Sequence, residues 1–188
     1  MRIFCFIGPP SCGKGTQAKN IKNRYGVKHI STGTLIREEI KKENKYGILL
    51  KKYVDKRELI PDNLIQILLE NIIINSSIED SIIIDGFPRT VGQVDNFLNF
   101  LNKKNLNIEK MIILSVSEKE LSRRKEKRRI ESNRTDDKEE IQKYREIVYN
   151  RDTIPAIEKL KSRIEFCEIL AEGTISQVSN QIVKCMEL

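Results

Sequence analysis

Gly8-Pro9-Pro10-Ser11-Cys12-Gly13-Lys14-Gly15-Thr16 is the stretch from which the rest of this chain can be interpreted. An apolar run short enough for one buried strand, residues 2–7, precedes it, and a helical pattern over residues 18–25 follows. In that context, backbone N–H groups and a helix N-terminus converge on a phosphate, and Lys14 reaches the outer phosphates of a nucleotide. An ordinary strand-to-helix turn that contains Gly and Lys is the weaker interpretation, because both flanking elements are present. The stretch predicts a phosphate-binding loop.

Length and charge limit the kind of protein. With 188 residues, 39% of them hydrophobic, the chain is long enough for one full core and too short for two comfortable domains. A net charge of +7 suits nucleic acid, a membrane surface or a polyanionic small substrate as the partner. The lysines are spread through helical stretches, so we assign most of them to solvated faces.

The four cysteines, Cys5, Cys12, Cys167 and Cys185, form no C-x-x-C pair. We therefore expect neither a zinc site nor a disulfide framework, and a reducing compartment suits them. The phosphate-binding loop begins at residue 8, which leaves no room for a presequence, and no apolar run is long enough to span a bilayer. These features predict a cytoplasmic protein that does not bind membranes.

Beyond the loop, strand and helix patterns alternate, which is typical of an α/β fold with a parallel sheet. We expect strands at residues 2–7, 27–30, 81–85, 109–116 and 163–170. Further helices are expected at residues 32–42, 46–56, from 61 onward, 117–130 and 176–186. His29, the only histidine, is expected to be a structural strand-end residue, because nothing here requires a histidine base.

A second polar segment, Asp85-Gly86-Phe87-Pro88-Arg89-Thr90, directly follows the β-branched strand at residues 81–85. Taken alone, its aspartate could cap a helix and its arginine could be a surface charge. In an open parallel sheet, however, residues at the carboxyl ends of strands line the ligand crevice. We therefore expect this segment to face the same crevice as the phosphate-binding loop.

Residues 123–129 form a strongly basic run on an expected helix. In isolation, such a run is more often a solvated face, or a nucleic-acid patch, than a catalytic feature. Arg124 and Arg128 are four residues apart and share one helix face, whereas the other basic residues of the run are expected to be solvated.

Three motifs together resemble the nucleoside monophosphate kinase family, and within it the short-lid adenylate and UMP/CMP kinases. They are G-x-P-x-x-G-K-G-T-Q at residues 8–17, S-T-G at 31–33 with an arginine four residues later, and D-G-F-P-R-T at 85–90 with Gln93 beyond it. The resemblance covers the whole chain as a single domain. It implies a P-loop NTPase-type five-stranded parallel sheet with helices on both faces. The implied parts are a core (1–30, 61–117, 137–188), a helical nucleotide-binding arm (31–60) and a short lid (118–136).

The resemblance also implies a role for individual residues. It places these on the ATP side: Ser11, Cys12, Gly13, Lys14, Gly15, Thr16, Arg124, Arg128 and Gly173. It places these on the AMP side: Thr32, Gly33, Arg37, Glu58, Leu59, Ile60, Gly86, Phe87, Arg89, Gln93, Arg134 and Arg145. The catalytic set that it implies is Lys14, Asp85, Arg89, Arg128, Arg134 and Arg145.

The implied activity is reversible, magnesium-dependent phosphoryl transfer from ATP to AMP, giving two ADP. Magnesium would accompany the nucleotide, held through water by Asp85 and by Thr16, and no zinc is implied. Thr32, Thr90 and Gln93 favour AMP over UMP or CMP as the acceptor. A monomer with no nucleic-acid partner is expected.

Two departures from the family pattern leave alternatives open. Thr34 occupies the position of a family aspartate that helps to hold magnesium-bound water, and Ser11 replaces a loop glycine. If position 11 has a positive φ angle, a residue other than glycine costs roughly 1–2 kcal/mol there. The alternatives are a UMP/CMP kinase, or a nucleotide-binding protein of the same fold with weak or no turnover.

Overall fold

The computed structural model describes residues 1–55, 60–131 and 139–188. Its strands are β1 (Arg2–Ile7), β2 (Lys28–Ser31), β3 (Ser81–Asp85), β4 (Ile108–Ser115) and β5 (Phe166–Leu170). The first helices are α1 (Lys14–Tyr25), α2 (Thr32–Lys41), α3 (Lys45–Asp55), α4 (Asp62–Ile74) and α5 (Val91–Lys103). The later ones are α6 (Glu118–Glu131), α7 (Glu139–Val148), the π-helix η2 (Tyr149–Thr153), α8 (Ile154–Lys161) and α9 (Ile175–Met186).

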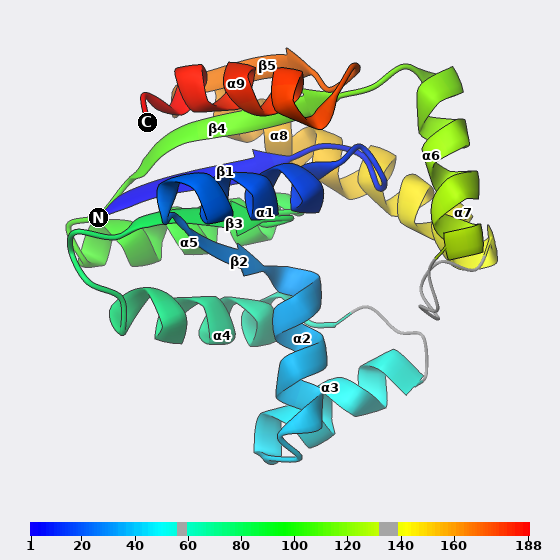
Figure 1. Ribbon diagram of the computed structural model, residues 1–188. Coiled ribbons are helices and arrows are strands. Elements are labelled where there is room, and N and C mark those ends of the chain that lie inside the picture. Colours follow the sequence, from blue (N-terminus) through cyan, green and yellow to red (C-terminus); the bar gives the residue numbers. More distant parts are fainter. Residues whose placement is uncertain (56–59, 132–138) are drawn as a thin grey trace.

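The strands form one five-stranded sheet in the order β2-β3-β1-β4-β5, and each neighbouring pair is parallel. This arrangement confirms the predicted fold class. The central strand β1 pairs with β3 on one side and with β4 on the other, so the chain reverses its direction of winding at β1 (Figure 1). Parallel sheets of this kind bind ligands beyond the carboxyl ends of the strands, at that point of reversal.

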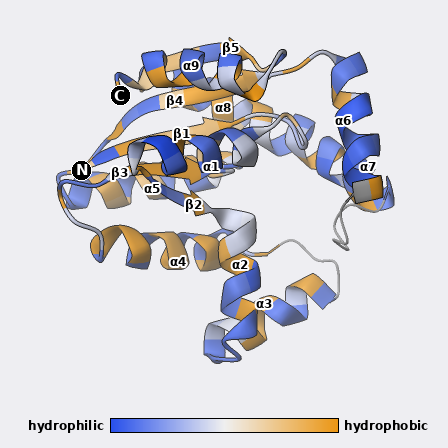
Figure 2. Cartoon of the chain, in the orientation of Figure 1, coloured by the Kyte–Doolittle hydropathy of each residue, from blue (hydrophilic) through white to orange (hydrophobic). Residues whose placement is uncertain are grey.

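Two hydrophobic cores lie on the two faces of the sheet, because successive side chains of β1 point to opposite faces. Ile3, Cys5 and Ile7 pack in the core that contains α4, α5 and α8. Phe4 and Phe6 pack in the core that contains α1 and α9. Both faces of the sheet are therefore covered, which explains why β1 is apolar from Ile3 to Ile7 (Figure 2).

Two groups of helices extend away from these cores (Figure 1). Helices α2 and α3 project below β2, and a small satellite cluster of Leu50, Leu64 and Leu68 joins α3 to the start of α4. Helices α6 and α7 project beyond the carboxyl ends of the strands, and α6 is predominantly hydrophilic (Figure 2). None of the helices in the described part of the chain is long and apolar enough to cross a membrane.

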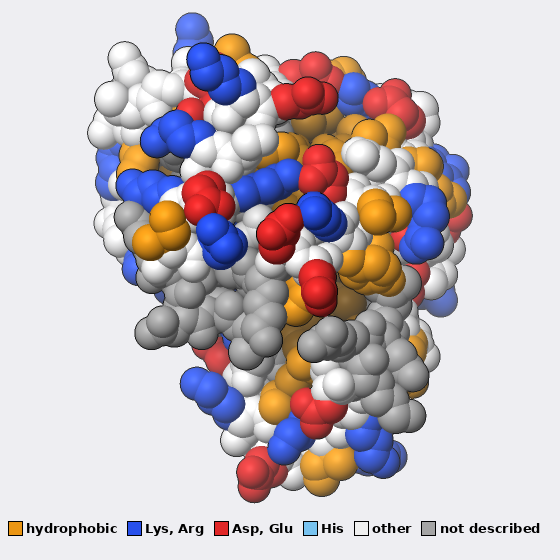
Figure 3. Space-filling view, turned by 90° about the vertical axis from the view of Figure 1, so that its right-hand side faces the viewer, with side chains coloured by type: hydrophobic (Ala, Val, Ile, Leu, Met, Phe, Trp, Pro, Cys, Tyr) orange, Lys and Arg blue, Asp and Glu red, His pale blue; other side chains and the backbone are white. Residues whose placement is uncertain are grey.

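The basic run of α6 is largely balanced by acids on the same or a neighbouring helix. Arg123 pairs with Glu120, and Arg129 pairs with Glu126, each within one helical turn. Lys125 is half-buried and pairs with Glu146 of α7 at 2.5 Å. On the face that carries α6 and α7, acidic and basic side chains are interspersed (Figure 3). Interspersed charges of this kind do not form the continuous basic stripe typical of nucleic-acid binding.

The fifth strand is shorter than predicted, since it begins at Phe166 and not at Arg163. The reason lies in backbone hydrogen bonding at the end of α8: the N–H groups of Arg163 and Ile164 both donate to the carbonyl of Leu160. These residues are therefore held in the turn that ends the helix and cannot join the ladder with β4.

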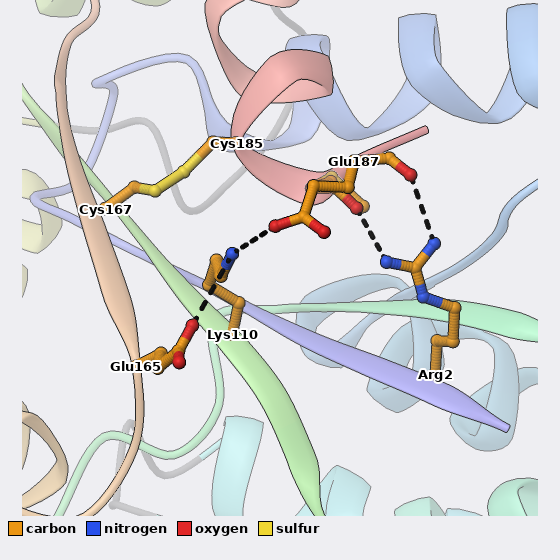
Figure 4. The surroundings of a disulfide bond; sticks show 7 residues. Arg2, Lys110, Glu165, Cys167, Cys185 and Glu187 are labelled. Atoms are coloured by element: carbon orange, nitrogen blue, oxygen red, sulfur yellow. Dashed lines mark hydrogen bonds and ion pairs between the residues drawn. A yellow bond between two sulfur atoms is a disulfide. The ribbon is translucent and has the colours of Figure 1, made fainter.

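The expectation of no disulfide was wrong. Cys167 of β5 and Cys185 of α9 form a disulfide, with their Cα atoms 6.6 Å apart (Figure 4). Strand and helix meet here because α9 packs on β5 and its C-terminal end is anchored to the sheet. Lys110 donates to Glu187 at 3.0 Å, and Arg2 donates to the carbonyl of Met186 at 2.8 Å. Sequence spacing could not reveal the pair, because the two residues are 18 apart and meet only through tertiary packing.

This disulfide gives a first prediction. Closing a loop of this length stabilises the folded chain by about 3 kcal/mol in the loop-entropy account. For a chain of this size, reduction should then lower the thermal midpoint by roughly 6–12 °C. Thermal unfolding of the oxidised protein with and without dithiothreitol measures the effect. Cys185→Ser is the control, because it should unfold at the lower midpoint under both conditions. Identical midpoints for the unmodified protein in both buffers would contradict the pairing.

Candidate active site

A cleft of about 1150 Å³ opens at the carboxyl ends of the strands. It is larger than the sites of about 300–1,000 Å³ that hold one small ligand. Its walls come from the loop after β1, the starts of α1 and α2, the segment after β3, and helices α6 and α7. The described basic residues that line it are Lys14, Lys19, Lys22, Lys28, Arg37, Arg89, Arg124, Lys127, Arg128 and Arg145. The described acids that line it are Glu38 and Asp85, so the cleft favours polyanions.

The loop after β1 has the geometry of a phosphate cradle. Gly8 lies against the backbone carbonyl of Leu114 in β4, where a Cβ atom would clash, so only glycine allows the loop to pack on the sheet. Gly13 is left-handed, and α1 begins at the next residue. The ammonium group of Lys14 folds back onto the loop and donates to the carbonyls of Gly8 (2.7 Å) and Pro9 (2.9 Å). A phosphate in the cradle would offer this lysine a charged acceptor in place of two carbonyls.

Ser11 has a φ angle of 68°, in the left-handed region that favours glycine. Position 11 therefore has the positive φ angle at which a residue other than glycine is strained. The backbone of the loop is kept in its conformation although a Cβ atom makes that conformation unfavourable. Strain of this kind is held by the surrounding structure and is often found at ligand sites.

Asp85 ends β3 and lies beside the start of α1. A Cβ atom placed on Gly15 would be 3.3 Å from Oδ2 of Asp85, so the carboxylate directly adjoins the phosphate-binding loop. On its other side, Nε2 of His29 lies 3.5 Å from the same carboxylate oxygen, although it has no hydrogen-bond partner among the described residues. Parallel pairing of β2 with β3 brings these two side chains together.

Arg89 lines the cleft, in the segment after β3. Its Nε donates to the carbonyl of Gly86 at 2.5 Å, and one terminal nitrogen donates to the hydroxyl of Thr32 at 3.2 Å. The residue is exposed toward the cleft, although nearby protein atoms partly desolvate its guanidinium. This desolvation, together with the nearby charge of Arg145, lowers the pKa of Arg89, while Asp85 raises it. The arginine remains charged, because its ordinary pKa lies far above neutral.

Arg37 reaches the cleft from α2 and donates to the hydroxyl of Thr34 at 3.0 Å. Thr34, which stands where the family pattern has an aspartate, therefore contacts Arg37 one turn away on the same helix. A carboxylate at this position would meet the same guanidinium.

Arg124 forms part of the opposite wall. Its terminal nitrogens donate to the carbonyls of Cys12 (2.8 Å) and Ala171 (2.7 Å). It thereby connects α6 both to the phosphate-binding loop and to the segment that follows β5. Arg128 is half-buried one turn further along α6 and also lines the cleft.

The structure brings most of the predicted site residues to one cleft. Those that line it are Ser11, Gly13, Lys14, Gly15, Thr16, Gly33, Arg37, Asp85, Gly86, Arg89, Arg124, Arg128 and Arg145. Those that do not line it are Cys12, Thr32, Ile60, Phe87, Gln93 and Gly173. Three further predicted residues, Glu58, Leu59 and Arg134, lie outside the described residues.

Some of the residues away from the cleft surface have structural partners. Phe87 is buried in the core and packs edge-on against Phe97. Gln93 is buried, and its amide accepts from the backbone N–H of Arg89 (2.7 Å) and donates to Asp62 (2.6 Å). In this conformation they support the segment that carries Arg89.

Sequence reasoning missed several cleft residues, and two of them had been given other places. His29 was expected to be structural, yet it lines the cleft beside Asp85. Lys127 was assigned to a solvated face, yet it also lines the cleft. For His29 the signal was present, because a residue near the carboxyl end of a parallel strand can reach the ligand edge of the sheet.

The conformation of Ser11 gives a second prediction. Ser11→Gly removes a strain of roughly 1–2 kcal/mol but adds about 0.5–1 kcal/mol of chain entropy to the unfolded state. The free energy of unfolding should therefore rise by about 0.5–1 kcal/mol, measured by urea denaturation. Ser11→Ala is the matched control: it removes the hydroxyl, keeps the Cβ atom and should bring no such gain. If the glycine variant were no more stable than the alanine variant, the backbone at position 11 would not be strained.

Comparison with known proteins agrees with this geometry. A family model described as adenylate kinase matches residues 6–165. An adenylate kinase of Phocaeicola vulgatus is 38% identical over 187 residues, covering 100% of this chain and 99% of the relative. One of Leptospira biflexa is 35% identical over 184 residues (98% and 99%), and one of Pseudarthrobacter chlorophenolicus is 33% identical over 187 (100% and 97%). This chain belongs to the adenylate kinase family.

Proposed function

We propose that this chain catalyses reversible, magnesium-dependent phosphoryl transfer from ATP to AMP, giving two ADP. One observation carries the proposal: arginines and a lysine from separate elements meet at one cleft beside a phosphate cradle. Lys14 comes from the start of α1, Arg37 from α2, Arg89 from the segment after β3, and Arg128 and Arg145 from α6 and α7. A charge arrangement of this kind suits two polyanions bound end to end.

The chemistry explains why cations are prominent at the site. An acceptor monophosphate has a second pKa of about 6, so its attacking oxygen is already ionised at neutral pH and needs little help from a base. The barrier lies in bringing two anions into line and in stabilising the charge spread over the transferring phosphoryl group. Fixed cations in a site shielded from water meet both needs.

On the donor side, the loop of residues 11–16 would bind the ATP phosphates through its backbone N–H groups. Lys14 would exchange its bonds to the carbonyls of Gly8 and Pro9 for the outer phosphates. Arg124, Arg128 and the backbone of Gly173 complete the proposed donor site.

On the acceptor side, Arg37 and Arg89 would hold the AMP phosphate. The hydroxyl of Thr32, which Arg89 contacts, couples this arginine to the start of α2. Gln93 fixes the backbone of Arg89 through its amide oxygen. The proposed acceptor site further comprises Gly33, Ile60, Gly86, Phe87 and Arg145, and on the undescribed segments Glu58, Leu59 and Arg134.

The residues near the cradle fit magnesium. The carboxylate of Asp85 and the hydroxyl of Thr16 are hard oxygen donors at adjoining positions of the cleft. In the described part of the chain, no three His, Cys, Asp or Glu side chains form a metal cluster. We propose that Asp85, through water, and Thr16 hold the ion jointly with the nucleotide phosphates. Magnesium held there would supply positive charge that neutralises part of the phosphate charge.

We further propose a division of labour within the single domain. The core (1–30, 61–117, 137–188) fixes the cradle, while the arm (31–60) and the short lid (118–136) close over the substrates and exclude water. The protein is proposed to work as a cytoplasmic monomer on free nucleotides, without zinc and without nucleic-acid or membrane partners.

Two alternatives are less well supported. A UMP/CMP kinase is disfavoured, because the full-length relatives named above are all called adenylate kinases. A protein of this fold with weak turnover would follow if Ser11 and Thr34 disabled the site. The strained Ser11 backbone nevertheless keeps the loop in its cradle conformation, and α1 begins directly behind it.

The third prediction tests the reaction and its acceptor together. With ATP and magnesium, AMP should be phosphorylated far faster than CMP or UMP, with ADP formation followed in a coupled assay. Omitting each nucleotide in turn controls for ATP hydrolysis. Comparable rates with CMP would support the UMP/CMP alternative, and no ADP above the hydrolysis control would support a protein without turnover.

A further inference from the structure

We propose that Glu120 is a positioning residue for the ATP side of the site: it acts through Arg124, which ties the phosphate-binding loop to the segment after β5. This inference rests on the proposed function, because it takes the loop around Cys12 as the donor phosphate site.

Arg124 donates hydrogen bonds to three parts of the chain: α6, the phosphate-binding loop and the segment after β5. Its Nε donates to the carboxylate of Glu120 at 2.8 Å, one helical turn earlier on α6. Its two terminal nitrogens donate to the carbonyls of Cys12 and Ala171, at 2.8 and 2.7 Å. A guanidinium has its five donors in a rigid planar fork, so fixing Nε also fixes the direction of the other two bonds.

The surroundings suit this role. The side chains of Glu120 and Arg124 are each 22% exposed, so their ion pair is partly shielded from water. The bonds from Arg123 and then Arg124 lower the pKa of Glu120 to about 2. Because the folded-state pKa is depressed, the carboxylate stays charged at every pH above that value, including the whole range in which the enzyme would work.

A second contact fixes the same junction. Glu172 directly follows Ala171 in the chain. Its carboxylate accepts a hydrogen bond of 2.7 Å from the backbone N–H of Ser117, just before α6. Leu121, next to Glu120, is buried. The first turn of α6 is therefore attached to the core, and Arg124 extends this attachment into the cleft. Glu120 holds Arg124 in this position by accepting the hydrogen bond from its Nε, which would otherwise be donated to water.

The acceptor wall is built from other residues. Arg37 and Arg89 lie on α2 and on the segment after β3, and their described partners are Thr34, Gly86 and Thr32. Loosening Arg124 should therefore disturb ATP binding and leave AMP binding unchanged. A general loss of stability would not separate the two substrates in this way.

The test compares Glu120→Gln with Glu126→Gln. Both changes remove one negative charge from α6, and Glu126 also pairs with an arginine three residues later, at 2.6 Å, but away from the cleft lining. Glu120→Gln replaces a charge-assisted bond with a neutral one, so we expect KM for ATP to rise about five-fold, while kcat and KM for AMP stay unchanged. Glu126→Gln should match the unmodified enzyme in all three constants.

A second variant asks whether Glu120 works through Arg124. Lysine carries its donors on one nitrogen and cannot bridge three separated oxygens, so Arg124→Lys should itself raise KM for ATP. Adding Glu120→Gln to this background should then change KM no further. Equal shifts in the KM of both substrates, no shift for Glu120→Gln, or additive effects in the double variant would each overturn the inference. Failure of the unmodified protein to form ADP would instead remove the proposed function.

Discussion

The parallel alignment of the five strands around β1 is the constraint on which the rest of the structure depends. Because all strands point the same way, the phosphate-binding loop, Asp85 and the segment carrying Arg89 emerge at one edge. The two faces are closed by separate cores, and helices α2, α6 and α7, which lie outside them, supply walls of the cleft. The site thus follows from topology: the crossover from β2 to β3 supplies α2, and the crossover from β4 to β5 supplies α6 and α7.

Concentrated positive charge is the main chemical property of this site, and it has an energetic cost. Arg89 has a lowered pKa because it is desolvated and close to Arg145, so the free protein holds like charges against their repulsion. The strained backbone of Ser11 adds to this cost. Bound phosphates would relieve the repulsion and would give Lys14 a better acceptor than two carbonyls. The cleft is therefore organised in advance for polyanions, as phosphoryl transfer requires.

Much of this could be predicted from local sequence. The cradle and the Asp85–Arg89 segment are contiguous motifs, and strand patterning gave the correct fold class. The prediction that no disulfide forms was wrong because it depended on tertiary packing: Cys167 and Cys185 meet only because α9 packs on β5. The bonds from Arg124 to Cys12 and Ala171 could not be predicted either, since folding alone brings these residues together. The place of His29 near the carboxyl end of β2, by contrast, could have indicated its position at the cleft. The family pattern placed Phe87 and Gln93 at the site, whereas their side chains here support it from behind.

The central claim is that Lys14 and its neighbouring cations stabilise the charge of phosphoryl transfer. Measuring kcat for Lys14→Met at saturating ATP, AMP and magnesium tests it most directly, with Lys103→Met as a control on the exposed end of α5. Losing a contact made mainly in the transition state costs about 3 kcal/mol of barrier, so kcat should fall roughly a hundredfold. The thermal midpoint and the control should be unchanged. A folded Lys14→Met enzyme with near-normal turnover would contradict the claim.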